Sequence, residues 1–290
     1  IEPLDVIQVQ DYDRLRDKGS YLANFTATGH TYNPGDDTVD LILDEVSTSS
    51  VDLRSSAFSP LNLPHLEAWY DATQETIYSD TDAVYLLSDW SGNANHASEG
   101  AGSYQPEYQA DAKNGEPAIY FDGGDRLLVG DVEFHDNKRG MYLAVVTKRD
   151  VGAAWSDTVI AKYKTTPPGY REWHIENGLV TCQDDPTTYD SNTQVWTGCS
   201  EDVWYIIESI YYPGDKMDCY VNGVQKGPST SAITDISDTT ADLWIGAQKT
   251  GATNPLDGHI GEIIACSSSL TAQARLECRE YLSAKWDISV

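Results

Sequence analysis

Short apolar segments separated by turn residues recur along most of this chain, and this spacing constrains the fold more than any other feature. Pro213-Gly214-Asp215-Lys216 separates residues 203–212 from 217–221, which is a clear hairpin signal. Helical periodicity is nearly absent before residue 270. The pattern predicts an all-β chain folded as an antiparallel β-sandwich or jelly roll. The expected strands are 118–121, 126–129, 141–147, 158–164, 171–176, 193–197, 203–212, 217–221, 241–247 and 259–266.

One helix is expected, near the C-terminus. Thr271 is suited to cap its N-terminal end. Ala274, Cys278 and Leu282 then fall at i, i+4 and i+8, which places them on one apolar stripe that Trp286 extends. We expect this helix to close one end of the sandwich.

The first 65 residues differ from the rest of the chain. Segments 4–9 and 39–43 are typical of short strands, but polar stretches separate them and the apolar residues are too few for an independent core. The sequence therefore predicts an N-terminal β arm at residues 1–65 and a β-sandwich at residues 66–290. We expect residues 1–60 to attach the protein to a homo-oligomer or a larger assembly.

The chain is strongly acidic, with 46 Asp and Glu against 19 Lys and Arg and a net charge of −27. Phosphate contacts need clustered Lys and Arg, so this charge argues against nucleic-acid partners and against docking on anionic lipid. No apolar run approaches the roughly 20 residues of a membrane-spanning helix. Three explanations of the charge stay open: a halophilic or marine source, an extracellular surface that meets divalent cations, and simple solubility.

The five cysteines show neither C-x-x-C nor the Cys/His spacing of a structural zinc site. Cys182 and Cys199 bracket a polar loop, and a disulfide between them is the preferred pairing, worth roughly 3 kcal/mol. Buried free thiols are the alternative.

Four segments resemble the motifs of a known family. Residues 87–97 (LSDWSGNANHA) resemble the D-x-S-G-N-x-N-x-A loop of laminin-G-like jelly rolls, and residues 115–123 (GEPAIYFDG) resemble their G-x-P-A-x-x-F-D-G strand. Residues 219–223 (CYVNG) are similar to their Y-V-N-G hairpin. Residues 257–264 (DGHIGEII), with 281–286 (YLSAKW), are similar to their closing strand and helix.

In order and spacing these segments cover roughly residues 66–290, so this part resembles a laminin-G-like domain of the concanavalin A-like lectin/glucanase superfamily. The resemblance implies a β-sandwich. Such domains are common in secreted, cell-surface and phage structural proteins. They usually recognise carbohydrate or protein, and a few relatives cleave polysaccharide. Because a fold does not define an activity, the function must come from a site.

Catalysis has one weak pair of candidates. Glycoside hydrolysis needs two carboxylates roughly 5–9.5 Å apart, and the resemblance to glucanases implies that they lie on one strand with an E-x-D-x-x-E type spacing. Glu172, His174 and Glu176 fall on one face of an expected strand, with His where the pattern has a carboxylate. An exposed polar strand face is therefore the preferred interpretation of Glu172 and Glu176.

Metal binding has several weak candidates among the Asp and Asn residues. Calcium takes six to eight oxygen ligands, and Asp89 with Asn93, or Asp122 with Asp125, could supply some of them. No stretch matches an EF-hand loop. Turn formation by these Asp, Asn and neighbouring Gly residues is the preferred explanation, and calcium stays open as a cofactor.

Aromatic side chains suggest a ligand surface, because sugar rings stack on exposed Trp and Tyr while nearby polar groups bind their hydroxyls. Tyr170, Trp173, Tyr189 and Trp196 lie in or beside the polar segment 165–200, which is the candidate surface. A loop packed on a neighbouring subunit is the alternative. Strands that the family buries carry three further aromatic residues, which are assigned to the core: Trp204, Tyr220 and Trp244.

Together these features favour a non-catalytic recognition or structural module of a surface assembly. A virion fibre, a capsid decoration or a cell-surface appendage would suit this build, with a surface glycan or protein as ligand and an extracellular or virion-surface location. A polysaccharide hydrolase or lyase on the same sandwich, and a purely architectural subunit that binds no sugar, remain as alternatives.

Overall fold

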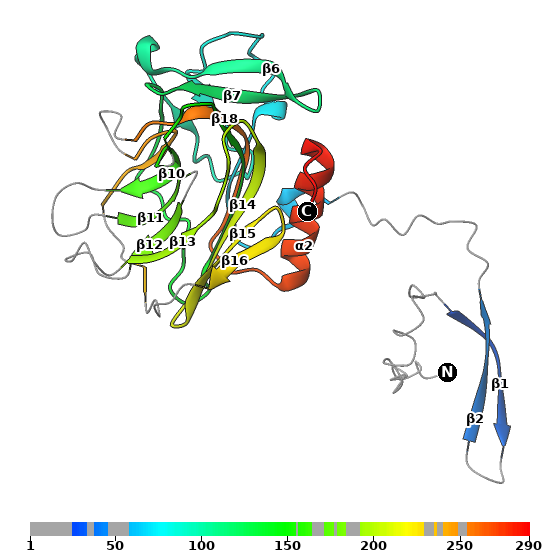
Figure 1. Ribbon diagram of the computed structural model, residues 1–290. Helices are drawn as coiled ribbons and strands as arrows, with labels where there is room; N and C mark the ends of the chain where they lie inside the picture. Colours follow the sequence, from blue (N-terminus) through cyan, green and yellow to red (C-terminus); the bar gives the residue numbers. More distant parts are fainter. Residues whose placement is uncertain are drawn as a thin grey trace. The chain divides into compact units, whose positions relative to one another are not determined.

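The computed structural model describes residues 25–33, 38–45, 58–154, 156–163, 171–176, 179–183, 192–228, 235–236, 240–248 and 254–290. The chain divides into two compact units, residues 1–57 and residues 58–290 (Figure 1).

The first unit contains an antiparallel hairpin. Strand β1 (Phe25–Asn33) pairs with β2 (Thr38–Glu45), and the register is irregular between Ala27 and Gly29. The strand expected at residues 39–43 is therefore present within β2. The one expected at residues 4–9 lies outside the described residues.

The first sheet of the second unit has the strand order β16-β15-β14-β9-β18-β7-β6, and β3 also pairs with β18. The central strand β18 uses its first half to pair with β7 and its second half to pair with β3, while β9 follows its other side. The strands are β3 (Leu66–Asp71), β6 (Glu107–Lys113), β7 (Glu116–Asp122), β9 (Met141–Arg149), β14 (Trp204–Tyr212), β15 (Lys216–Val221), β16 (Val224–Pro228) and β18 (Asp257–Cys266).

The second sheet has the order β13-β12-β11-β10-β17-β8-β5-β4, and all its described pairings are antiparallel. Its strands are β4 (Leu86–Leu87), β5 (Ala97–Ser98), β8 (Leu127–Gly130), β10 (Thr158–Tyr163), β11 (Arg171–Glu176), β12 (Leu179–Gln183), β13 (Asn192–Trp196) and β17 (Leu243–Ile245).

An apolar core fills the space between the two sheets. Strand β9 shows how the sequence builds it, because successive side chains of a strand point to opposite faces. Leu143 and Val145 join the core between the sheets, whereas Tyr142, Ala144 and Val146 join a second apolar cluster on the outer face of the first sheet. The predicted antiparallel sandwich is confirmed.

Helix α2 (Ala272–Trp286) covers that outer cluster. It begins as expected, because the Thr271 hydroxyl accepts a hydrogen bond from the Ala274 amide at 3.2 Å. Cys278, Leu282 and Trp286 are buried on the predicted stripe. The expectation that α2 closes one end of the sandwich is wrong: it lies along the outer face of the first sheet (Figure 1), where apolar residues of β9, β14 and β18 need cover.

Short 3-10 helices link the early strands: η1 (Pro60–Asn62), η2 (Ala72–Gln74) and η3 (Gly102–Tyr104). Within the described part of the chain, no helix combines the length and the apolar character that crossing a membrane requires.

Candidate functional site

The aromatic residues predicted from segment 165–200 do not form a described ligand surface. Trp173 is only 1% exposed and stacks on Phe134 inside the core, with ring centroids 5.9 Å apart. Its proposed role as an exposed sugar platform is therefore wrong, because its position on β11 points it between the sheets. Tyr170, Tyr189 and the side chain of Trp196 lie outside the described residues.

The predicted catalytic strand face is buried rather than exposed. His174 and Glu176 on β11 are both buried, and Glu176 Oε1 accepts a hydrogen bond from Gln248 Nε2 at 2.7 Å. His174 Nε2 lies 3.5 Å from the same oxygen. The side chain of Glu172 lies outside the described residues. The described partners of Glu176 are thus a residue of its own strand and one that follows β17.

The Asp89 carboxylate organises a loop. It accepts hydrogen bonds from the backbone amides of Trp69, Ser91 and Asn95 at 2.9–3.0 Å. Asn93 Nδ2 donates to the Leu66 carbonyl at 2.8 Å. These bonds tie the loop to β3, which supports the turn-forming explanation of both residues.

Asp122 and Asp125 form a second such turn. Asp125 Oδ2 accepts from the Asp122 amide at 3.0 Å, and Asp122 Oδ1 accepts from the Gly124 amide at 2.8 Å. Gly123 has φ +84°, which suits a tight turn. Within the described ranges, no group of three or more His, Cys, Asp and Glu side chains is placed to hold a metal ion.

Cys199 carries a free thiol. The predicted disulfide with Cys182 is therefore not formed in this structure. Cys219, Cys266 and Cys278 are also free and are buried, as the alternative interpretation expected. The side chain of Cys182 lies outside the described residues.

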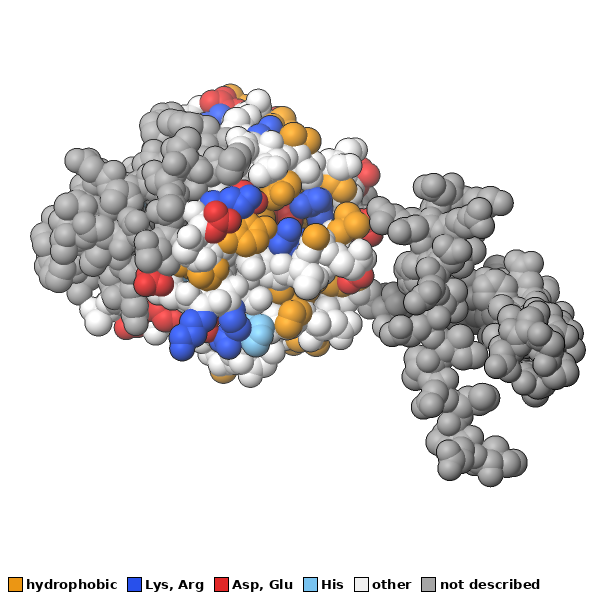
Figure 2. All heavy atoms as spheres, turned by 90° about the horizontal axis from the view of Figure 1, so that it is seen from below, with side chains coloured by type: hydrophobic (Ala, Val, Ile, Leu, Met, Phe, Trp, Pro, Cys, Tyr) orange, Lys and Arg blue, Asp and Glu red, His pale blue; other side chains and the backbone are white. Residues whose placement is uncertain are grey.

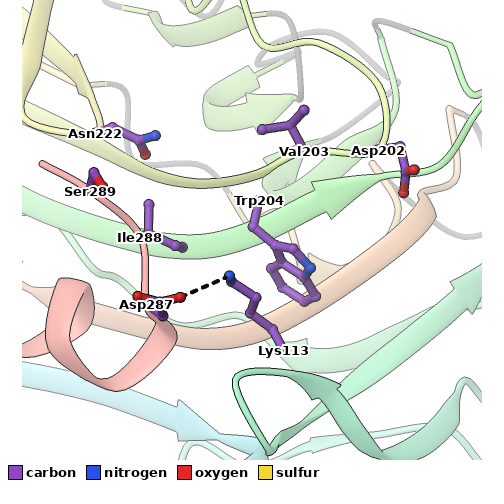
Figure 3. A pocket seen from close by; sticks show the side chains of 8 residues that line it. All are labelled: Lys113, Asp202, Val203, Trp204, Asn222, Asp287, Ile288 and Ser289. Atoms are coloured by element: carbon purple, nitrogen blue, oxygen red, sulfur yellow. Dashed lines mark ion pairs between the residues drawn. The ribbon is translucent and has the colours of Figure 1, made fainter.

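A hollow of about 360 Å³ lies on the outer side of the first sheet, beside the C-terminal end of α2 (Figure 3). Four chain segments build it: the β6–β7 turn, the loop before β14, the β15–β16 turn and the residues after α2. Its lining combines an aromatic ring with polar and charged groups, from Lys113, Asp202, Val203, Trp204, Asn222, Asp287, Ile288 and Ser289.

Trp204, the first residue of β14, supplies the aromatic ring. Its indole stacks on that of Trp286, with centroids 5.9 Å apart and planes inclined by 20°. The Trp204 side chain is only partly buried and lines the hollow. Its assignment to the core is thus half correct: one part packs under α2 and another faces the hollow. Trp244 is buried as predicted, and Tyr220 is partly buried.

Asn222 occupies the β15–β16 turn, where Asn-Gly favours the left-handed conformations that a two-residue hairpin needs. Its φ is +47°, and that of Gly223 is +73°. The Asn222 side-chain oxygen accepts from the Ile206 amide at 2.8 Å, while the Asn222 amide donates to the Ile206 carbonyl at 2.9 Å. These bonds fix the side chain, so the Asn222 Nδ2 group can donate to a ligand.

The β6–β7 turn closes the opposite wall. Asn114 Nδ2 donates to the Lys285 carbonyl in the last turn of α2 at 2.9 Å. Lys113 Nζ lies 3.8 Å from Asp287 Oδ2, and Figure 3 shows its side chain reaching past the Trp204 indole. Because a helix C-terminus is the negative end of the dipole, a lysine is favoured there.

Three lining residues share an uncommon backbone conformation. Asp202, Asn222 and Asp287 have φ values of +54°, +47° and +47°. Asp and Asn tolerate this left-handed region better than other non-glycine residues. Turns and the C-terminal cap of α2 thus supply three of the polar side chains that line the hollow, and this convergence makes it the strongest candidate site among the described residues.

A row of side chains continues from the hollow across the first sheet. Directly paired positions on neighbouring strands place Trp204 beside Lys148, Lys148 beside His259, and His259 beside Tyr120. The His259 ring lies 4.9 Å from Tyr120 and 5.7 Å from Trp204, between centroids. Lys148 Nζ contacts Asp150 at 3.1 Å and Asp202 at 3.2 Å, which positions Asp202 at the edge of the hollow.

Burial and the positive charge of Lys148 lower the pKa of His259 to about 4. The imidazole is therefore neutral at pH 7. Its Nε2 lies 2.9 Å from Gln109 Oε1 and its Nδ1 lies 3.4 Å from Asp150 Oδ1.

Basic and acidic side chains are mixed on one face of the sandwich. One face of the sandwich shows Lys and Arg in small groups beside acidic side chains, with hydrophobic side chains exposed between them (Figure 2). On that face the basic charge is dispersed rather than gathered into one patch.

Residues 121–274, more than half of the chain, match a family described as the concanavalin A-like lectin/glucanases superfamily. The chain belongs to the concanavalin A-like lectin/glucanase superfamily. Asp202, Trp204 and Asn222 lie inside the matched range of this superfamily member, whereas Lys113 and Asp287 lie outside it.

Solved structures are similar in fold to this superfamily member. The receptor binding domain of botulinum neurotoxin D superposes with a TM-score of 0.52 at 13% identity, over 80% of this chain and 57% of that one. Domain 4 of an extracellular arabinanase from Geobacillus stearothermophilus, solved with arabinotriose, gives a TM-score of 0.46 at 16% identity, over 73% of this chain and 97% of that domain. A search of the curated proteins found no match.

The sequence analysis did not identify most of the residues that line the hollow. Trp204 and Asn222 were recognised, but as fold motifs. Lys113, Asp202 and Asp287 carry no motif, and they line one hollow only because chain segments that are distant in sequence converge there. An Asp at a turn, where the left-handed conformation is tolerated, is the sequence signal that could have found Asp202 and Asp287.

Proposed function

We propose that this protein is a non-catalytic recognition module that binds a glycan in the hollow beside Trp204. The observation that carries the proposal is the combination, in one hollow, of a partly exposed indole with an amide, two carboxylates and an ammonium group. An apolar platform with a few convergent polar groups is the usual composition of a small-ligand site.

The chemistry of the lining matches that of a pyranose. The C–H face of a sugar ring packs on an indole, and each hydroxyl both donates and accepts hydrogen bonds. Asp202 and Asp287 can accept from hydroxyls, while Asn222 Nδ2 can donate to one. The hydrogen bonds that anchor Asn222 hold its amide in place before a ligand arrives, which reduces the entropy lost on binding.

The test is a glycan-binding screen of the full chain at high salt, repeated with a chelator. We expect binding that Trp204→Ala abolishes and that the matched variant Trp90→Ala leaves unchanged, because Trp90 is an exposed tryptophan that does not line the hollow. Asp202→Asn, on an exposed side chain, serves as a second variant that spares the packing of Trp204 on Trp286. Loss of binding in the presence of the chelator would indicate that the site requires calcium.

Two results would contradict the proposal. Silence of the folded protein towards all glycans would favour the architectural subunit. Equal binding by the Trp204 and Trp90 variants would place the site elsewhere.

We further propose that residues 1–60 attach this module to a surface assembly, outside the cell or on a virion, in a saline setting. Support comes from the acidic charge and from the division of the chain, in which the described strands β1 and β2 pair only with each other. A two-stranded hairpin is marginally stable alone, so a partner would complete it. Sedimentation of the full chain over a wide concentration range should show self-association, and a strict monomer would contradict a homo-oligomer.

A further inference from the structure

Around the hollow, carboxylates outnumber ammonium groups and are more exposed to solvent. Three carboxylates, of Asp150, Asp202 and Asp287, lie in or next to it, against the two ammonium groups of Lys113 and Lys148. The whole chain carries a net charge of −27, so no distant excess of positive charge compensates.

The lysine side chains are less exposed than the carboxylates: that of Lys113 is 26% exposed. Lys148, with a side chain 18% exposed, lies between Asp150 and Asp202 at 3.1 and 3.2 Å. Lys113 faces Asp287 at 3.8 Å, a distance too long for a hydrogen bond. The Asp202 and Asp287 side chains are 66% and 78% exposed, so their carboxylates are what an incoming ligand meets.

The nearest imidazole and the uncharged lining residues add no positive charge. The neutral His259 imidazole contacts Gln109 and Asp150 rather than the hollow. Of the remaining lining residues, Asn222 and Ser289 are uncharged and Val203, Trp204 and Ile288 are apolar.

Resting on the proposed function, we propose that the hollow selects a neutral sugar and discriminates against glycans whose terminal residue carries a carboxylate or a sulfate. A neutral hydroxyl donates to Asp202 or Asp287 and accepts from Asn222. An anionic group in the same position loses its water and faces two carboxylates of its own sign. Exposed carboxylates thus act as the negative element of the specificity.

The test compares matched glycan pairs on an array and in solution calorimetry. Each pair is a neutral oligosaccharide and its sialylated, uronic or sulfated counterpart, including N-acetyllactosamine with its sialylated forms and glucose oligomers with glucuronic acid oligomers. At about 0.05 M salt we expect the acidic member to bind about tenfold more weakly, and the difference to shrink as salt screens the carboxylates.

In the double variant Asp202→Asn/Asp287→Asn, the affinities for the neutral and the acidic member of each pair should become more similar. Asn keeps the left-handed backbone and removes both charges. Lys138→Met, a substitution of an exposed residue away from the hollow, should leave the difference in affinity unchanged. An acidic glycan that binds the native protein as tightly as its neutral counterpart would overturn this inference alone. If no glycan of either class binds, the proposed function fails and the inference with it.

Discussion

Lys285 Nζ of α2 lies 2.9 Å from Glu262 Oε2 of β18 and 2.7 Å from Asp71 Oδ2 at the end of β3, and both carboxylate side chains are fully buried. Glu262 also accepts hydrogen bonds from the indole nitrogens of Trp69 and Trp286, at 2.7 and 3.1 Å. One network thus joins an early strand, the central strand and the helix.

Lys285→Met should destabilise the protein by about 3–5 kcal/mol, because it leaves two like charges buried without their cation. Burial and Asp71 already raise the pKa of Glu262, and Lys285 opposes that rise. Removing the lysine raises this pKa further, so the variant should regain stability as the pH falls towards the unfolded-state pKa of Glu. Urea unfolding at several pH values measures both effects, with the exposed Lys138→Met as the control. A loss no larger than that of the control would show that the network contributes little.

Gly261→Ala should destabilise the fold by about 1–3 kcal/mol through overpacking. An added Cβ would overlap the Trp286 indole, which lies directly over this position of β18. Gly100→Ala is the matched control, because its Cβ would meet no atom within 4 Å. Thermal unfolding of both variants makes the comparison, and equal melting temperatures would mean that α2 can shift away from the sheet.

Asp157→Asn should stabilise the protein at pH 7. Burial, reinforced by the charge of Asp257, raises the pKa of Asp157 to about 6, so the folded protein holds this carboxylate ionised at a cost above that pH. In the native protein, protonated Asp157 therefore contributes stability that is fully present below the unfolded pKa of about 3.9. This contribution is lost as the pH rises through 6.

The advantage of the Asp157→Asn variant should therefore be largest at pH 7, at most about 3 kcal/mol, and should fade between pH 6 and 4. Urea unfolding across this range tests it against Asp111→Asn, an exposed change on β6. An advantage that is constant with pH would contradict the assigned cause.

Lys148→Met should raise the pKa of His259 from about 4 towards its ordinary value, because the lysine repels a proton on the imidazole. Burial remains the larger cause, so the recovery should be partial. In the native protein, neutral His259 contributes stability above the unfolded pKa of about 6.5 that is lost as the pH falls towards 4. An NMR titration of the imidazole protons measures the pKa directly. A native value near 6.5 would show that His259 is more open to water than the packing of Tyr120 and Trp204 implies.

The strand pattern and the motifs around Gly115–Gly123 and Cys219–Gly223 were sufficient to predict the sandwich, because alternation and turn chemistry are local properties. The helix was predicted from the Thr271 cap and the apolar stripe, but its position on the outer face of the first sheet was not predicted. That place depends on the outward-facing side of β9, whose apolar residues could be seen to need cover only once the sheet was assembled.

The candidate site was misplaced for a related reason. Composition drew attention to Trp173 in an aromatic, polar segment, yet the register of β11 turns this ring into the core. Trp204 was assigned to the core because its strand is buried, although the strand begins at the rim where one part of the ring is free.

The sequence by itself determined the all-β class, the helix and its cap, the acidic charge and the turns that hold Asn222 and Asp89. Each of these rests on neighbours along the chain. Only the tertiary structure decided which turns meet: Lys113, Asp202, Asn222 and Asp287 are distant in sequence and converge because β6, β14 and β15 belong to one sheet and α2 ends over it. Long-range convergence follows from strand order and packing, which local patterns do not encode.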